Sequence, residues 1–273
     1  MSNAAGEVCG KSRMRENLTY GLTRGGLKRS STLLGKTTTA INLSAFLASL
    51  GQKVLLVDTD AQGNATSGLG VDRGELGQSI YDLFTGGADA GTIIRPTEVE
   101  GLDILPSTMA LAGAEIELVG VEGRERLLQR SIAQKRGDYD FVFIDCPPSL
   151  GLLTVNALTA ADSVLVPIQC EYYALEGVGQ LMKTIQLVRA RLNSRLQLEG
   201  VVLTMFDGRT NLAIQVVQEV KNHFKEKVYR TVIPRNVRLS EAPSYGQPIG
   251  LYDRRSRGAE VYHDLAREVL GHE

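Results

Sequence analysis

Short apolar runs alternate with helical segments along this chain of 273 residues, and the alternation constrains its fold more than any other feature. The runs lie at about residues 53–58, 102–106, 140–145, 163–168, 200–205 and 228–233. Apolar residues recur at helical spacing in 174–193, 211–226 and 257–270, which predicts helices there. Continuous apolar runs between helices are typical of parallel strands buried on both faces. The sequence therefore predicts an α/β fold, a mostly parallel sheet with helices on both faces.

Two of these runs end in a carboxylate. Asp58 closes the run at 53–58 and Asp145 the run at 140–145. The carboxyl ends of parallel strands share one edge of a sheet, where α/β proteins build their sites. We therefore expect Asp145 to organise a Mg²⁺ ion, in preference to an ordinary capping or turn role. Asp60 is likewise either a functional carboxylate or an ordinary turn residue. The turn is an option because Gln62, Gly63 and Asn64 follow it.

The sequence Gly35-Lys36-Thr37-Thr38 has the form of the second half of a phosphate-binding loop. In such a loop the backbone N–H groups and the positive end of a helix face an anion. The first half is missing: Ser30 stands where the pattern requires glycine, and the bulky Leu33 and Leu34 precede Gly35. The tripeptide alone is equally compatible with a lysine at an ordinary helix start.

Residues 1–34 fit the predicted fold badly. A phosphate loop must follow a strand, and the single candidate, residues 18–22, is interrupted by Gly21 and predicts an edge strand. Residues 24–31 predict a flexible basic loop. We therefore divide the chain into an atypical segment, 1–34, and one domain, 35–273.

Charge is segregated along the chain. Residues 37–182 carry a net charge of −11, and the parts on either side carry +5 each, although the whole chain has −1. Such segregation permits a basic face that binds phosphate backbones, whereas exposed charges often only solvate helices.

The spacing of Cys9, Cys146 and Cys170 suggests neither a disulfide framework nor a zinc site. No apolar run is long enough for a membrane span, so we expect a cytoplasmic protein.

Five segments together resemble the ParA/Soj family of chromosome- and plasmid-partitioning ATPases. They are residues 35–38 (GKTT), 57–66 (VDTDAQGNAT), 143–151 (FIDCPPSLG), 169–173 (QCEYY) and 233–243 (IPRNVRLSEAP). The resemblance implies a P-loop NTPase of the deviant Walker A, SIMIBI type, which closes into a homodimer around ATP and Mg²⁺. It also implies non-specific DNA and a ParB-like centromere-binding protein as partners, no membrane, and a place on the nucleoid.

The resemblance assigns roles to individual residues. Lys36 would contact the β and γ phosphates, Thr38 the α phosphate, and Thr37 the Mg²⁺, with Gly35 in the loop. Asp60 would position the attacking water, Asp58 would support the metal shell, and Asp145 would hold Mg²⁺ through water. Pro234, Arg235 and Asn236 would line the adenine pocket. The residues implied in DNA contact are Arg209 and Arg238, with Lys221 and Lys225 as weaker candidates.

The chain departs from the family in front of Gly35. The family pattern Lys-Gly-Gly-Val-Gly-Lys-Thr is Ser-Thr-Leu-Leu-Gly-Lys-Thr here, so Ser31 replaces the lysine that reaches the partner subunit's phosphates. Loss of such a cation costs orders of magnitude in rate. Two explanations stay open: residues 1–34 are out-of-frame or mis-started sequence before a sound ATPase, or the chain is a catalytically impaired relative that binds only DNA or a partner.

Overall fold

A computed structural model describes the chain at residues 29–34, 37–147, 149, 151–171 and 174–271. In this part the sheet has eight strands in the order β3-β4-β2-β5-β1-β6-β7-β8. The strands are β1 (Arg29–Leu34), β2 (Val54–Asp58), β3 (Arg95–Pro96), β4 (Leu102–Leu105), β5 (Phe141–Cys146), β6 (Ser163–Gln169), β7 (Gln197–Phe206) and β8 (Val228–Pro234). All neighbouring strands are parallel except β3, which runs antiparallel to β4.

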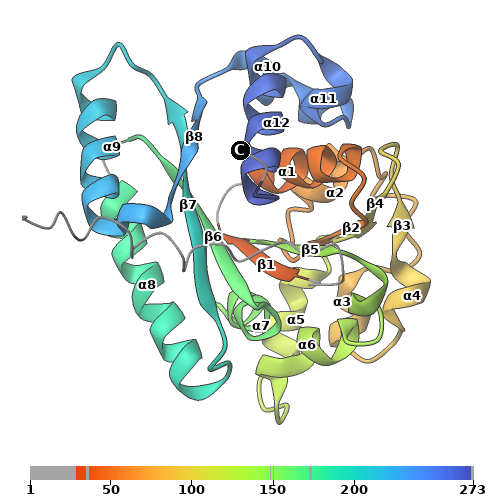
Figure 1. Ribbon diagram of the computed structural model, residues 1–273. Coiled ribbons are helices and arrows are strands. Elements are labelled where there is room, and N and C mark those ends of the chain that lie inside the picture. Colours follow the sequence, from red (N-terminus) through yellow and green to blue (C-terminus); the bar gives the residue numbers. More distant parts are fainter. Residues whose placement is uncertain (1–28, 35–36, 148, 150, 172–173, 272–273) are drawn as a thin grey trace, which may run out of the picture.

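Helices cover both faces of the sheet (Figure 1). One face carries α1 (Thr37–Ser49), α2 (Asn64–Gly68), α10 (Val237–Glu241), α11 (Ile249–Tyr252) and α12 (Arg257–Val269). The other carries α3 (Ile80–Phe84), α4 (Ala90–Ile93), α5 (Leu111–Glu117), α6 (Leu127–Ile132), α7 (Leu152–Ala160), α8 (Ala174–Arg191) and α9 (Asn211–Phe224). Short 3₁₀ turns lie at η1 (Arg124–Arg126), η2 (Arg136–Asp138), η3 (Lys225–Lys227) and η4 (Ala242–Tyr245).

The predicted α/β architecture is confirmed. Every residue of β2 and β5 is buried, because helices pack on both sides of these strands. One apolar core lies between the sheet and α1 and α12, and a second lies between the sheet and α7 and α8. The helices predicted at 174–193, 211–226 and 257–270 correspond to α8, α9 and α12, each within two residues at either end.

The predicted loop was wrong at residues 29–31, while residues 24–28 lie outside the described residues. Instead of a loop reaching Ser31, the chain forms β1, the strand between β5 and β6 at the centre of the sheet. Register pairs Ser31 with Phe143 and Leu34 with Cys146. The earlier strand candidate, residues 18–22, lies outside the described residues. A sequence that is only partly apolar fills this position because its backbone hydrogen-bonds to strands on both sides.

Cys146 and Cys170 are free and buried, as expected of small apolar residues. Among the described residues, no helix is both long enough and apolar enough to cross a bilayer.

Candidate functional site

The two aspartates that end the apolar runs lie side by side. Asp58 on β2 is the register partner of Asp145 on β5, at the carboxyl edge of the sheet. Both side chains are completely buried. Thr59 reinforces the pairing, since its N–H and hydroxyl donate to the Asp145 carbonyl oxygen at 2.9 and 2.6 Å. Both aspartates therefore lie at the carboxyl edge, as the sequence predicts, and the strand register places them next to each other.

Hydrogen bonds hold the Asp58 carboxylate in place. Thr66 donates to Oδ2 twice, from its backbone N–H at 2.9 Å and its hydroxyl at 2.7 Å. The Asp60 N–H donates to Oδ1 at 3.1 Å. The Thr66 hydroxyl in turn accepts the Ser107 N–H at 2.9 Å, which ties β2 to the end of β4. Burial raises the pKa of Asp58 to about 6, and the bonds from Thr66 partly oppose it.

Asp145 is different, because neither carboxylate oxygen has a hydrogen-bond partner of ordinary length within the described residues. Burial, followed by the charge of Asp58, raises the pKa of Asp145 well above its usual range, while the Thr37 hydroxyl acts in the opposite direction. A buried carboxylate without a partner is costly unless a cation compensates it. A cation bound beside these oxygens would compensate their burial.

The available donors fit Mg²⁺. Thr37 is the first residue of α1 and half-buried, and with Asp145 it supplies the oxygen ligands that Mg²⁺ prefers. No group of three or more His, Cys, Asp or Glu side chains suited to a metal exists in the described part of the chain. Mg²⁺ commonly takes one or two protein ligands and completes its shell with water and phosphate oxygens, so two ligands suffice.

Only part of the candidate phosphate loop can be described. Gly35 and Lys36 lie outside the described residues, between the end of β1 at Leu34 and the start of α1 at Thr37. Thr38 is half-buried, and its carbonyl accepts the Asn42 side-chain amide at 2.8 Å. The Asn42 Oδ1 accepts the Ile249 N–H at 2.7 Å, which anchors this turn of α1 to α11.

Asp60 opens a tight turn directly beyond Asp58. Its Oδ1 accepts the Gln62 N–H at 2.9 Å, and its carbonyl accepts the Gly63 N–H at 2.9 Å. The turn that the sequence suggested is therefore present. The Asp60 Oδ2 accepts no hydrogen bond from the described residues, so the turn geometry leaves one oxygen free for a second role.

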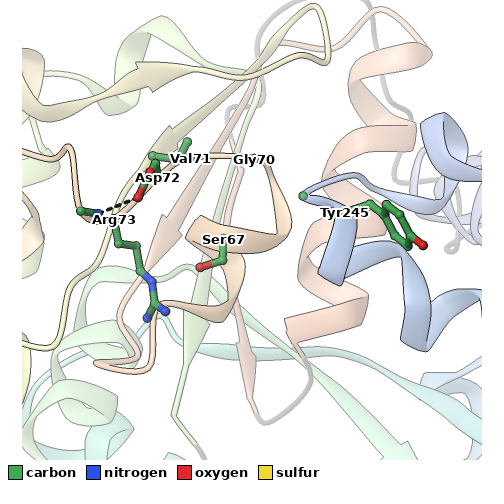
Figure 2. Close-up of a pocket in the computed structure, with 8 residues that line it drawn as sticks. Ser67, Gly70, Val71, Asp72, Arg73 and Tyr245 are labelled. Atoms are coloured by element: carbon green, nitrogen blue, oxygen red, sulfur yellow. Dashed lines mark hydrogen bonds between the residues drawn. The ribbon is translucent and has the colours of Figure 1, made fainter.

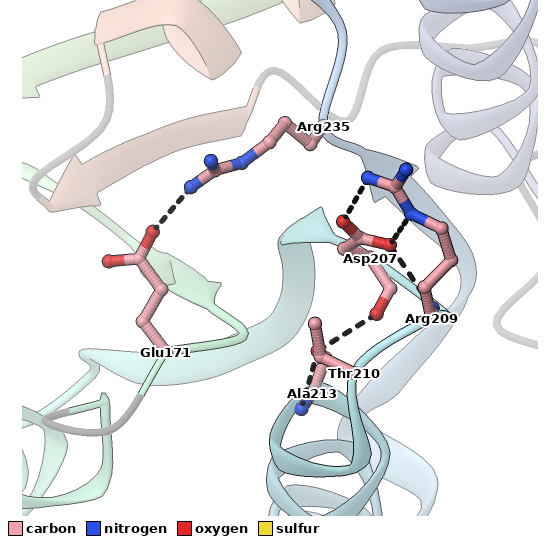
Figure 3. Close-up of polar contacts among 6 residues, drawn as sticks. All are labelled: Glu171, Asp207, Arg209, Thr210, Ala213 and Arg235. Carbon is pink, nitrogen blue, oxygen red and sulfur yellow. Dashed lines mark hydrogen bonds and ion pairs between the residues drawn. The ribbon is translucent and has the colours of Figure 1, made fainter.

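Residues 234–236 lie where β8 ends. The Arg235 N–H donates to the Phe206 carbonyl at 3.0 Å, and its guanidinium pairs with Glu171 at 3.2 Å, as Figure 3 shows. Asn236 uses its Oδ1 to accept the Arg238 N–H at 2.8 Å and thereby caps α10. Pro234 and Asn236 are half-buried.

The candidate DNA-binding residues do not form one cluster. Arg209 donates two side-chain hydrogen bonds to the Asp207 carboxylate, of 2.9 and 2.7 Å (Figure 3). The Arg209 side chain is nevertheless 88% exposed. The Arg238 Nη1 forms an ion pair with the Glu241 Oε2 at 3.0 Å, and the Arg238 Nε lies 3.6 Å from the Asp253 Oδ2. Lys221 and Lys225 are exposed near the other end of α9, about 20 Å along the helix from Arg209.

Comparison with known proteins decides the family. A family model described as an AAA domain matches residues 33–198. The sporulation initiation inhibitor protein Soj of Bacillus subtilis is 62% identical over 236 residues, which cover 86% of this chain and 93% of Soj. The chromosome partitioning protein ParA of Myxococcus xanthus is 53% identical, covering 87% of this chain and 84% of ParA. The chain belongs to the ParA/Soj family of chromosome-partitioning ATPases.

The fold of this ParA/Soj protein also matches a solved structure of a nucleotide-bound protein. Cobyrinic acid a,c-diamide synthase from Mycobacterium smegmatis, with bound ATP analogue and magnesium, superposes with a TM-score of 0.77 at 37% identity. The superposition covers 89% of this chain and 95% of the synthase. The predicted P-loop fold is thereby confirmed.

Two residues that support this site were not singled out from the sequence of the ParA/Soj protein. Thr66 and Ser107 form the hydrogen-bond chain behind Asp58, and both are completely buried. Thr66 lies within a segment that resembles the family, so its position was a signal. Nothing in the sequence pointed to Ser107, because its contact is made by the backbone N–H and not by the side chain.

Proposed function

We propose that this chain is an ATP-dependent partitioning ATPase that acts in chromosome or plasmid segregation. The observation that carries the proposal is the buried Asp145 carboxylate, which lacks a hydrogen-bond partner of ordinary length among the described residues and lies beside Asp58 at the carboxyl edge of the sheet. The high identity to Soj and ParA supports it.

In this proposal the nucleotide binds where β1 and β5 meet the start of α1. Lys36 contacts the β and γ phosphates, Thr38 contacts the α phosphate, Thr37 and Asp145 hold Mg²⁺, and residues 234–236 contact the adenine. Bound Mg²⁺ neutralises charge on the phosphates. Asp60 orients the attacking water through its free Oδ2. Two hydrogen bonds from Thr66 hold the Asp58 carboxylate, and Asp58 supports the metal shell as a negative charge beside the Mg²⁺ position.

The DNA-binding part of the proposal rests on exposed arginines. ATP would bring two subunits together, and the dimer would present two copies of Arg209 and Arg238 to non-specific DNA. Doubling the number of phosphate contacts raises affinity without a large change inside a subunit. A ParB-like protein would then stimulate hydrolysis and release the dimer, and the ATP-bound form would collect on the nucleoid.

The second candidate is an impaired relative that binds DNA or a partner without turnover. One observation favours it: β1 runs to Leu34 and α1 begins at Thr37, so residues 31–34 are strand where the family has Lys-Gly-Gly-Val. A phosphate cradle needs several loop residues whose N–H groups are free of strand pairing. Residues 31–34 are instead paired with β5.

Equilibrium binding of ATP with Mg²⁺ separates the two candidates. This chain is compared with a version in which residues 1–34 are replaced by an apolar strand followed by Lys-Gly-Gly-Val. Lys36→Ala tests the loop in each version, and Lys53→Ala, an exposed lysine outside the site, is the control. Tight binding by the original chain that Lys36→Ala abolishes supports the ATPase. Binding by the repaired version alone supports the impaired relative, and unchanged binding in Lys36→Ala refutes the loop assignment.

A further inference from the structure

A groove of about 470 Å³ is lined in part by Arg73, whose side chain also contacts the turn that carries Asp60. It lies between the residues that follow α2 and the η4 turn, and its lining includes Asp72, Arg73 and Tyr245. Figure 2 shows Arg73 and Tyr245 on opposite sides of this groove. Arg73 is exposed, and none of the roles given above uses it.

The Arg73 side chain reaches back to the Asp60 turn, which we define as residues 60–63. Its Nη1 donates a hydrogen bond to the Gln62 carbonyl oxygen. Its methylene stem lies over Gly63, since a Cβ built there would be 2.7 Å from the Arg73 Cδ and 3.1 Å from the Ser107 carbonyl oxygen. Gly63 has φ of 61°, a left-handed conformation that glycine adopts without strain. Arg73 therefore contacts the turn through both its charged head and its stem.

On its outer side the Asp60 turn is held by Arg73 and by its continuation into α2, where the Gly63 carbonyl accepts the Ser67 N–H at 3.0 Å. Within the turn, Oδ1 of Asp60 accepts the Gln62 N–H and the Asp60 carbonyl accepts the Gly63 N–H. Both bonds are internal to the turn, so they do not fix its tilt relative to the sheet. The bond from the Asp60 N–H to Asp58 fixes the inner end, the bond from the Ser67 N–H fixes Gly63, and the Arg73 bond restrains the exposed Gln62 between them. A turn held at both ends presents the free Oδ2 in one direction.

We propose that Arg73 is a positioning residue that latches the Asp60 turn and thereby aims the Asp60 carboxylate. The inference rests on the proposed role of Asp60 in orienting the attacking water. Arg73 touches neither reacting group; it acts through the Gln62 carbonyl. Displacing a positioned group by about 1 Å costs as much as 100-fold in rate, so an exposed latch has a large effect on turnover and a small effect on stability.

The first test uses hydrogen exchange and needs no turnover. In the nucleotide-free protein, Arg73→Ala is expected to speed exchange of the amides in residues 60–66 about fivefold or more, because the turn opens locally. Arg73→Lys keeps a donor for the Gln62 carbonyl and is expected to restore much of the protection. The control is Arg95→Ala, since Arg95 also donates to a backbone carbonyl, that of Thr92 at 2.8 Å. Unchanged exchange in Arg73→Ala would overturn the latch.

The second test measures single-turnover hydrolysis of ATP with Mg²⁺. Arg73→Ala is expected to slow the step by about 5- to 100-fold, with affinity for a non-hydrolysable ATP analogue changed no more than about twofold. Arg73→Lys is expected to recover part of the rate. In an Asp60→Ala background, Arg73→Ala is expected to have no further effect, because both act on the same carboxylate.

The outcomes separate this inference from the function on which it rests. If Asp60→Ala is slow but Arg73→Ala hydrolyses ATP as fast as the unmodified protein, the latch is refuted and the role of Asp60 stands. If Asp60→Ala hydrolyses ATP normally, the proposed role of Asp60 is refuted, and the positioning role of Arg73 with it. Additive losses in the double variant would show that Arg73 acts elsewhere.

Discussion

Asp145 shows at the scale of one residue how a buried carboxylate costs stability. Its carboxylate is completely buried and has no partner of ordinary hydrogen-bond length within the described residues. Asp58 beside it has three hydrogen bonds, so the two neighbouring carboxylates differ in their solvation. A buried group in this state persists when a ligand compensates it, and removing its charge relieves the cost of desolvation.

We predict that Asp145→Asn stabilises the nucleotide-free protein. The amide occupies the same volume without a charge, so Tm at pH 8 should rise by roughly 2–4 °C, the shift that about 1 kcal/mol produces in a protein of this size. Differential scanning calorimetry measures it, with the exposed Asp264→Asn as the matched control. The same variant should lose Mg²⁺-dependent ATP binding. A lower Tm would show that the Asp145 carboxylate has a structural partner.

A second prediction concerns the ion pair of Asp207. Hydrogen bonds from the Arg209 side chain and backbone lower the pKa of Asp207 to about 2. Because the folded pKa lies below the unfolded value of about 3.9, the pair stabilises the fold above pH 4 and loses this effect as pH falls through 2. Carbon-detected NMR titration should show the low pKa, and Arg209→Ala should return it toward 3.9. An unchanged midpoint in Arg209→Ala would contradict the pairing.

At the scale of elements, α1 is fixed by contacts far along the chain. The buried hydroxyls of Thr39 on α1 and Tyr262 on α12 lie 3.0 Å apart in a hydrogen bond. Asn42, one turn further along α1, accepts the Ile249 N–H of α11. The helix that begins at the candidate phosphate loop is therefore held against the C-terminal helices, and its position depends on their packing.

Tyr262→Phe should test this attachment. The substitution leaves the Thr39 hydroxyl buried without its partner, at an expected cost of about 1–3 kcal/mol. Urea unfolding measures the loss, and Tyr245→Phe, which removes a hydroxyl from an exposed ring, is the control. The double variant Thr39→Val with Tyr262→Phe removes both polar groups and should be more stable than Tyr262→Phe alone. Equal losses in single and double variants would rule out the pair as the cause.

Sequence and structure agree for elements with strong local patterns and differ where contacts are non-local. The runs ending in Asp58 and Asp145 predicted buried parallel strands, which the structure confirms, and the register adds that the two strands are neighbours. Strand β1 was missed because Arg29, Ser30 and Ser31 lack the apolar character of the other central strands; its place is set by pairing with β5 and β6. The bonds of Ser107 and Arg73 could not be predicted either, since each joins a backbone group to a side chain of another segment.

At the scale of the molecule, the carboxyl edge of the sheet combines the candidate nucleotide site with exposed positive charge. Asp58 and Asp145 end β2 and β5, while Arg209 and Arg235 follow β7 and β8 at the same edge. Arg235 is close enough to contribute to the low pKa of Asp207. Nucleotide binding and DNA binding would therefore use the same edge of the sheet.

The last prediction follows from this arrangement. Arg209→Ala should weaken ATP-dependent binding to non-specific DNA about tenfold or more and reduce the slope of log affinity against log salt by about 1 per subunit, because each lost phosphate contact releases one counterion fewer. Fluorescence anisotropy at several salt concentrations measures both quantities, and ATP-dependent dimerisation, followed by sedimentation, should not change. Arg189→Ala, an exposed arginine on α8, is the control. Unchanged affinity and slope would show that the Arg209 guanidinium serves only Asp207, and the DNA surface would then have to be sought at Arg238 or at the far end of α9.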